Sequence, residues 1–185
     1  PDNAGFKVTA WEIADDHLMI SAFHRGYEGL PGKPRVGRCL WYDRADTLVI
    51  ADWGRSEEEH DYTVSFTFPT MQVSPVCDGE ICTLHGDGDV LVRALPAPLP
   101  ARQQRAVREE RPWTLVYGVQ KPGIRVAMSQ RGQEAVFATV IRTYAGGQPP
   151  RFDAAVEVLA GTQPVACVRL KQGGVETTVR LERPF

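Results

Sequence analysis

The sequence lacks several features that would assign it directly to a class. No apolar run approaches the roughly 18 residues of a membrane-spanning helix, so we expect no membrane partner. Acidic and basic residues nearly balance, with a formal net charge of −2, so there is no basic excess to bind nucleic acid. No secretion signal precedes the first strand-like segment, and the chain starts at Pro1, which predicts a mature fragment or an excised domain.

Cysteine is scarce, and only two of the four cysteines lie close together in the sequence. Cys77 and Cys82 flank a turn-like Asp-Gly-Glu-Ile, and both a local disulfide and two reduced thiols fit that spacing. A zinc site needs a second pair of ligands at a set spacing, which the sequence does not provide. The short motifs of serine hydrolases, phosphate loops, zinc proteases and EF-hands are also absent. We therefore expect neither a metal nor a cofactor.

Short segments of alternating apolar and polar residues, separated by Gly, Pro and Asp, run through the chain. The clearest alternation places Tyr62, Val64, Phe66 and Phe68 at period two, after an acidic run that reads as an exposed turn. About a dozen such segments predict an all-β fold, an antiparallel β-sandwich forming a single domain over residues 1–185. Asp78-Gly79 predicts a hairpin. Residues 95–112, rich in proline with a charged centre, predict a long loop or one short helix.

In one segment an apolar strand pattern is followed directly by polar and charged residues. The apolar run before residue 24 is followed by His24, Arg25 and Tyr27, which together offer a base, a cation and a phenol. A neutral imidazole can accept a proton and a cation can neutralise a carboxylate, so the three side chains suit an acidic sugar. A histidine at a strand end, packed on a tyrosine, more often has a structural role.

Aromatic residues give a second indication of sugar binding, because Trp and Tyr rings stack on sugar faces. The chain has four Trp and five Tyr, most of them inside strand-like segments where core packing explains them. Trp41 and Tyr42 are neighbours in one segment and must point to opposite faces, so we expect one of them to be exposed.

The order of these pieces resembles the C-terminal β-sheet region of heparinase II/III-like polysaccharide lyases, from about residue 6 to about residue 182. The markers are Gly26-Tyr27, a basic strand from Arg35 to Arg38, a strand ending at Asp52, His60, and an aromatic strand ending at Pro69. Two later segments, residues 112–126 and 134–144, look like the Tyr-Gly strand and the penultimate strand of that family.

The resemblance implies cleavage of uronate-containing polysaccharide by β-elimination, in the periplasm or after secretion from a bacterium. The family's catalytic Tyr and His lie mainly in an N-terminal α/α-toroid and in the first part of its β region. That first part also supplies a His-rich metal site and a His-Asn element, and this chain has neither. The resemblance therefore implies that the catalytic part lies upstream of Pro1 or is missing, and that the partners are an upstream toroid domain and an anionic polysaccharide.

Three functions remain open from the sequence. The first is a non-catalytic C-terminal module of a lyase, with no catalytic residue of its own in this chain. Its substrate-binding candidates are His24, Arg25, Tyr27, Arg38 and Trp41. The second is a stand-alone carbohydrate-binding module, which needs at least two coplanar exposed aromatic rings. The third is a structural or adhesive sandwich, which predicts that every Trp is buried.

Overall fold

The structure is a computed structural model that describes residues 5–69, 74–78, 81–85, 89–96, 105–116, 119–144, 153–161 and 163–185. These residues form strands and no helix, so none of them belongs to a helix that is long and apolar enough to cross a membrane. The strands are β1 (Phe6–Ile13), β2 (Leu18–His24), β3 (Arg35–Tyr42), β4 (Thr47–Pro69), β5 (Ser74–Asp78), β6 (Ile81–His85), β7 (Asp89–Pro96), β8 (Arg105–Val116), β9 (Val119–Tyr144), β10 (Asp153–Leu159), β11 (Val165–Gln172) and β12 (Val175–Glu182).

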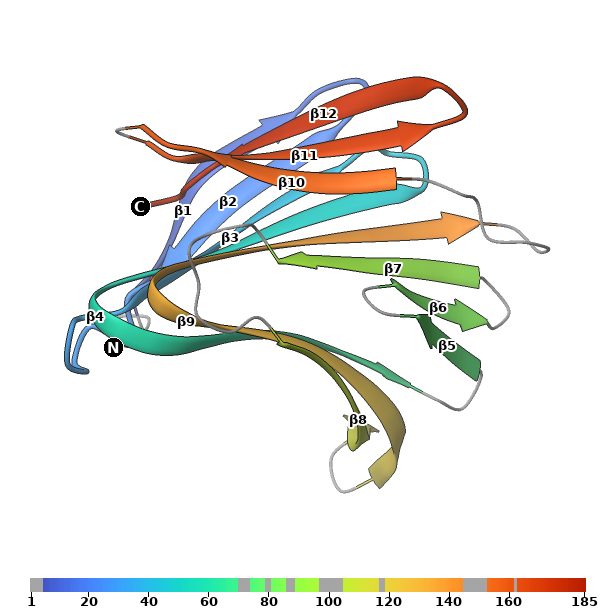
Figure 1. The fold of residues 1–185 in the computed structure, drawn as a ribbon, viewed down its shortest axis with the longest axis horizontal. Coiled ribbons are helices and arrows are strands. Elements are labelled where there is room, and N and C mark those ends of the chain that lie inside the picture. The colour runs from blue at the N-terminus through green and yellow to red at the C-terminus, as the bar shows by residue number, and fades with distance from the viewer. Residues whose placement is uncertain are drawn as a thin grey trace.

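The described strands make two antiparallel sheets that pack face to face (Figure 1). The large sheet has the order β1-β2-β3-β4-β9-β7-β6-β5, with β8 also paired to β9, and the small sheet is β10-β11-β12. A buried core fills the space between them, and its residues are Cys39, Val49, Ala51, Trp53, Val136, Ala138, Val140, Ala166, Val168, Val179 and Leu181. The predicted all-β antiparallel sandwich is confirmed.

Strands β4 and β9 are unusually long, with 23 and 26 residues, and both bend sharply at the same level (Figure 1). The pairing passes from Arg55↔Glu134 to His60↔Gly132, so four residues of β4, 56–59, lie opposite the single residue Gln133. Extra residues in one strand bend the pair and increase its twist. We call residues 47–55 of β4 with 134–144 of β9 the first arm, and residues 60–69 of β4 with 119–132 of β9 the second arm.

The bulge at 56–59 is held by the loop that follows β2. The Ser56 hydroxyl and the Glu57 backbone N–H both donate hydrogen bonds of 2.8 Å to the Gly32 carbonyl. Gly32 has a φ of +69°, and a Cβ at this position would overlap Ser56 and Glu58, so only glycine fits here. The acidic residues of the bulge are exposed, which keeps their charges in water.

A second buried cluster joins the two arms to each other. Tyr62, Val64 and Met128 come from the second arm, and Ala135 and Phe137 come from the first. The closest approach is between Gly54 and Tyr62, since a Cβ on Gly54 would overlap the tyrosine ring. The large sheet therefore folds over on itself and packs one of its faces against its own continuation.

Two of the predictions about individual segments differ from the structure. The acidic turn between two strands is wrong, because residues 56–59 are a bulge inside β4. The loop or helix over 95–112 is wrong at both ends, since 95–96 belong to β7 and 105–112 to β8, while 97–104 lie outside the described residues. Among the described strands β8 pairs only with β9, and sheet edges tolerate prolines and charges that are excluded from central strands.

The Asp78-Gly79 hairpin is confirmed, because β5 and β6 pair with Cys77 opposite Cys82. The side chains of both cysteines lie outside the described part of the structure, so their disulfide stays a prediction. Cys39 and Cys167 are free and buried.

Replacing Gly54 with Ala tests the packing of the two arms. The new methyl group must displace the Tyr62 ring, and we expect the free energy of unfolding to fall by about 1–3 kcal/mol, as in other overpacked cores. Gly29→Ala is the matched control, since nothing lies within 4 Å of a Cβ there. Urea unfolding of both variants gives the comparison, and equal stabilities would contradict the packing described above.

Candidate functional site

A cleft of about 610 Å³ opens between the two arms. Its walls come from segments far apart in the sequence: the loop after β2, strand β3, the first arm and the start of the second arm. Their side chains in the cleft include Tyr27, Leu30, Arg38, Asp52, His60 and Tyr62. The bend in β4 creates this cleft, because it places residues 60–65 across from residues 52–54.

Arg38 and Asp52 form the charged pair of the cleft. They are cross-strand partners in β3 and β4, and the Nε of Arg38 donates to Oδ1 of Asp52 at 2.6 Å. The guanidinium carbon lies 5.6 Å from the centre of the Phe66 ring, in reach of a cation–π contact. Among the described residues, no hydrogen bond engages the two terminal nitrogens of Arg38. Arg38 is therefore held at its Nε and by the ring, with its outer edge available to a ligand.

Asp52 is the more buried member of the pair, with 15% of its side chain exposed against 46% for Arg38. Burial raises the pKa of Asp52, and the hydrogen bond from Arg38 opposes that shift without reversing it. The second carboxylate oxygen, Oδ2, is buried and accepts no hydrogen bond from a described residue. This arrangement makes Asp52 a fixed anchor for Arg38.

His24, Arg25 and Tyr27 do not come together in one site. The Nδ1 of His24 accepts a hydrogen bond of 2.9 Å from the Gly26 backbone N–H, which fixes the imidazole in its own turn. The rings of His24 and Tyr27 pack with their centres 5.7 Å apart. Of the three residues, Tyr27 alone lines the cleft, and its side chain is 48% exposed.

Arg25 is engaged in a surface ion-pair cluster beside the cleft. Its Nε binds Oε1 of Glu28 at 3.0 Å, and the Nε of Arg35 binds the same oxygen at 2.8 Å. The hydrogen bond from Arg25, helped by Arg35, lowers the pKa of the Glu28 carboxyl. The Arg25 charge is thus matched to Glu28 within its own loop.

Trp41 lies on the opposite face of β3 from Arg38, because the two residues are three apart in a strand. Its ring stacks on His17 at 5.9 Å, and it lines two grooves of about 450 and 670 Å³ between the small sheet and the large sheet. Trp41 and Tyr42 are both partly buried, so the expectation that one of them is exposed is wrong.

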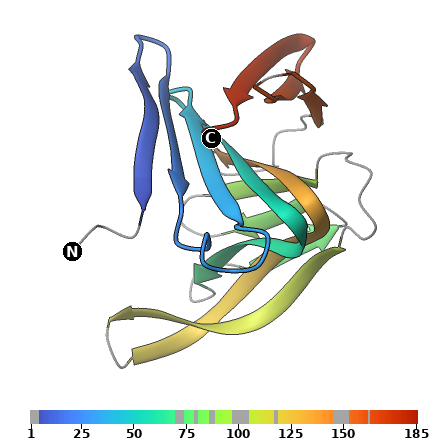
Figure 2. The same ribbon diagram turned by 90° about the vertical axis from the view of Figure 1, so that its left-hand side faces the viewer.

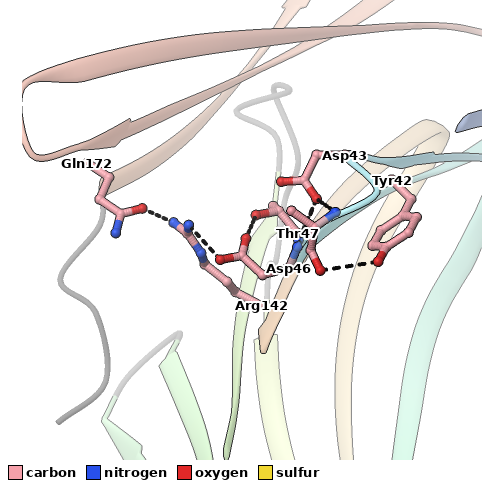
Figure 3. Close-up of polar contacts among 7 residues, drawn as sticks. Tyr42, Asp43, Asp46, Thr47, Arg142 and Gln172 are labelled. Carbon is pink, nitrogen blue, oxygen red and sulfur yellow. Dashed lines mark hydrogen bonds and ion pairs between the residues drawn. The ribbon is translucent and has the colours of Figure 1, made fainter. Parts of the chain in front are cut away.

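A polar network beside Trp41 joins the two sheets (Figure 3). Asp43 Oδ1 accepts hydrogen bonds of 2.9–3.0 Å from three backbone N–H groups of the turn that follows it. In the same turn Asp46 accepts a hydrogen bond of 3.0 Å from Arg142 of β9, which also donates to Gln172 of β11. This network holds the β3–β4 turn against the small sheet, so its polar groups serve the fold.

The cleft contains residues that sequence reasoning did not place in a site. Asp52 and His60 served only as markers of the resemblance, and Tyr62 only as part of a strand pattern. The Nε2 of His60 hydrogen-bonds the Pro31 carbonyl at 2.8 Å, and burial raises the pKa of the Tyr62 hydroxyl. Within the described residues, no group of three or more His, Cys, Asp and Glu side chains could hold a metal ion.

Comparison with known proteins gives similarity in structure alone. No family model matches the sequence, and no curated protein matches it. The chain is similar to a structure titled "Heparinase III-BT4657 gene product", with a TM-score of 0.78 and 10% identity over 96% of this chain. It is also similar to another heparinase III (TM-score 0.77, 15% identity, 96% of this chain) and to heparan sulfate lyase HepC from Pedobacter heparinus (0.70, 13%, 95%).

The chain spans little more than a quarter of each of these proteins, 27% of the two heparinase III structures and 28% of HepC. At such low identity the likeness establishes the fold. The resemblance expected from the sequence is confirmed at that level.

The raised pKa of Asp52 predicts a pH-dependent stability effect. The folded chain holds this proton above the ordinary pKa of 3.8, so the carboxyl favours folding at low pH, and its contribution is lost as pH rises through the raised value. In Asp52→Asn this titration is absent. We expect the unfolding free energy of the variant minus that of the wild type to increase as pH rises from about 3 to about 7. Urea unfolding across this range measures it, and a difference that decreases with pH would argue against the assignment.

Proposed function

We propose that the chain is the C-terminal β-sandwich module of a heparinase II/III-like polysaccharide lyase that acts on uronate-containing polysaccharide by β-elimination. The observation that carries this proposal is the structural match of 96% of the chain to 27% of a heparinase III. In the proposal, the catalytic groups belong to an upstream part of the protein, an α/α-toroid, and the enzyme works in the periplasm or is secreted.

The cleft between the arms supplies this module's contact with an anionic glycan. Arginine binds carboxylates through paired N–H groups, and the terminal nitrogens of Arg38 present that edge while Asp52 holds the Nε. The half-exposed ring of Tyr27 stands at the same cleft and offers a stacking surface to a sugar ring. A carboxylate-bearing sugar therefore matches both the charge and the apolar surface of the cleft.

The chemistry of β-elimination needs a base, an acid and a group that neutralises the uronate carboxylate. A base removes the proton at C5 of the uronate, the electron pair forms a C4–C5 double bond, and the 4-linked group leaves with a proton from an acid. Neutralising the uronate carboxylate makes the C5 proton more acidic, and Arg38 is suited to that step. The base and the acid are assigned to the upstream part of the protein.

The two other functions that the sequence left open gain less support. An inert structural sandwich predicts buried tryptophans, whereas Trp11 is 69% exposed. A stand-alone carbohydrate-binding module would use the same Arg38 cleft, and it leaves unexplained why the match covers so small a share of the similar proteins.

Replacing Arg38 with Met tests the glycan contact. Methionine keeps an unbranched apolar stem at this position and lacks the guanidinium, so a charge-assisted hydrogen bond worth about 1.5–3 kcal/mol is lost. We expect the dissociation constant for a uronate oligosaccharide to rise about 10- to 100-fold in calorimetric titration. The matched control is Arg169→Met, which removes an equally exposed arginine paired with Glu157 on the small sheet. Equal affinities of the two variants would refute the role of Arg38.

Replacing Tyr27 with Phe tests whether Tyr27 only lines the cleft or also acts as a general acid or base. Phe keeps the stacking surface and lacks the hydroxyl, so in the protein that includes the upstream part we expect turnover within about tenfold of the wild type. The measurement is the rate at which unsaturated uronate products form. A loss beyond about a hundredfold, the lower range for a general acid or base, would assign proton transfer to Tyr27.

A further inference from the structure

Strand β1 carries four apolar side chains on one face: Phe6, Val8, Trp11 and Ile13. Their spacing breaks the period of two, and a regular strand would point the first pair away from the second. The pairing shows why this does not happen: Val8 pairs with Ala22 and Ala10 with Ser21, which leaves Thr9 as an extra residue in a bulge. The Thr9 hydroxyl donates to the Ser21 carbonyl at 3.3 Å. The bulge thus returns all four apolar side chains to one face.

These side chains continue as apolar rows across β2 and β3 to β4. One row is Trp11, Ile20, Leu40 and Ile50, and the next is Ile13, Leu18, Tyr42 and Leu48. A third row, Val8, Ala22, Arg38 and Asp52, leads into the cleft. We call the apolar residues of these rows on β1, β2 and β3, together with Phe6, the apolar face; they are Phe6, Val8, Trp11, Ile13, Leu18, Ile20, Ala22, Leu40 and Tyr42.

Exposure falls along the first two rows from β1 to β4. In the first row Trp11 is 69% exposed, whereas Ile50 at the other end is 4% exposed. In the second row Ile13 is 62% exposed and Leu18 36%. The apolar face is the side of the large sheet that packs against the second arm further along, and the small sheet lies on its other side (Figure 2). The same side of the sheet is therefore packed at β4 and exposed at β1.

The size of the apolar face indicates the kind of partner. Its nine positions each occupy about 4.8 Å by 6.8 Å of the sheet, so the apolar face covers on the order of 300 Å². When the surface of the partner is counted as well, the contact buries about 600 Å². This is at the lower end of the range for interfaces between domains of one chain and below the roughly 1,200–2,000 Å² of a stable complex between free proteins. An interface of this area is typical of contact with another domain of the same polypeptide rather than with a second copy of the chain.

We propose that the apolar face is the docking surface for another folded domain of the same polypeptide, which presents an apolar surface to Trp11 and Ile13. This inference rests on the proposed function, since the similar lyases contain about three quarters of their length outside the matched region. The third row connects the face to Arg38, so the docked domain stands beside the cleft and forms part of its wall. Trp11, the largest and most exposed of these side chains, is the anchor of the interface.

Hydroxyl-radical footprinting of Trp11 tests the proposal directly. The protein encoded by the whole gene is compared with the 185-residue chain, and oxidation at each tryptophan is read by mass spectrometry. We expect Trp11 to react at least about fivefold more slowly in the whole protein, because an interface anchor is nearly fully desolvated. Equal reactivity in the two proteins, or a gene that encodes no further domain, would overturn the proposal.

Two matched variants of the whole protein give a second, independent readout. Trp11→Asp places a charge in the interface, whereas Val175→Asp places one at an equally exposed apolar residue of β12. By calorimetry we expect Trp11→Asp to lower or split the unfolding transition and Val175→Asp to leave it unchanged. Identical transitions would contradict docking, as would a Trp11-dependent dimer of the whole protein or saturable quenching of Trp11 by a uronate oligosaccharide.

The oxidation rate of Trp11 and the unfolding transition are both measured without a polysaccharide substrate and without turnover. The docking surface can therefore fail while Arg38-dependent binding holds, and the glycan proposal can fail while Trp11 is buried by a neighbouring domain.

Discussion

The bulge at residues 56–59 determines the course of the two longest strands, β4 and β9. Four residues of β4 face one residue of β9, and the two longest strands bend there together. The bend turns one continuous pair of strands into two arms, packs Tyr62 onto Gly54 and leaves the cleft between them. Gly32 fixes the bulge from outside through two hydrogen bonds, so the loop after β2 and the bend in β4 form one unit.

One face of the large sheet serves three purposes along its length. Where the arms meet, it forms the second buried cluster; beside them it carries the Arg38–Asp52 pair in the cleft; and beyond them, on β1 and β2, it presents exposed apolar side chains. The other face has a simpler role, since it packs against the small sheet. This asymmetry places the proposed ligand contact and the proposed docking surface next to each other and keeps Trp41 apart from both.

The sequence predicted the strands better than their connections. Alternation at period two identifies Tyr62, Val64 and Phe66, but an acidic run such as 57–59 has the composition of a turn whether it ends a strand or bulges within one. The charged, proline-containing stretch that forms part of β8 likewise resembles a loop, because sheet edges and loops tolerate the same residues. Sequence neighbours also proved a poor guide to the site: His24 and Arg25 satisfy local partners, while Asp52 and His60 enter the cleft through the bend. The exposure of Trp11 depends on what covers the sheet, which no local pattern records.

The bend in β4 builds the cleft to which we assign the binding of an anionic glycan. Amide hydrogen exchange with and without a uronate oligosaccharide tests it most directly, because exchange reports protection segment by segment. We expect slower exchange on both walls of the cleft, in residues 36–38 and 60–65, with no change in β10–β12. Protection confined to the small sheet and the Trp41 grooves, or no protection at saturating oligosaccharide, would contradict it.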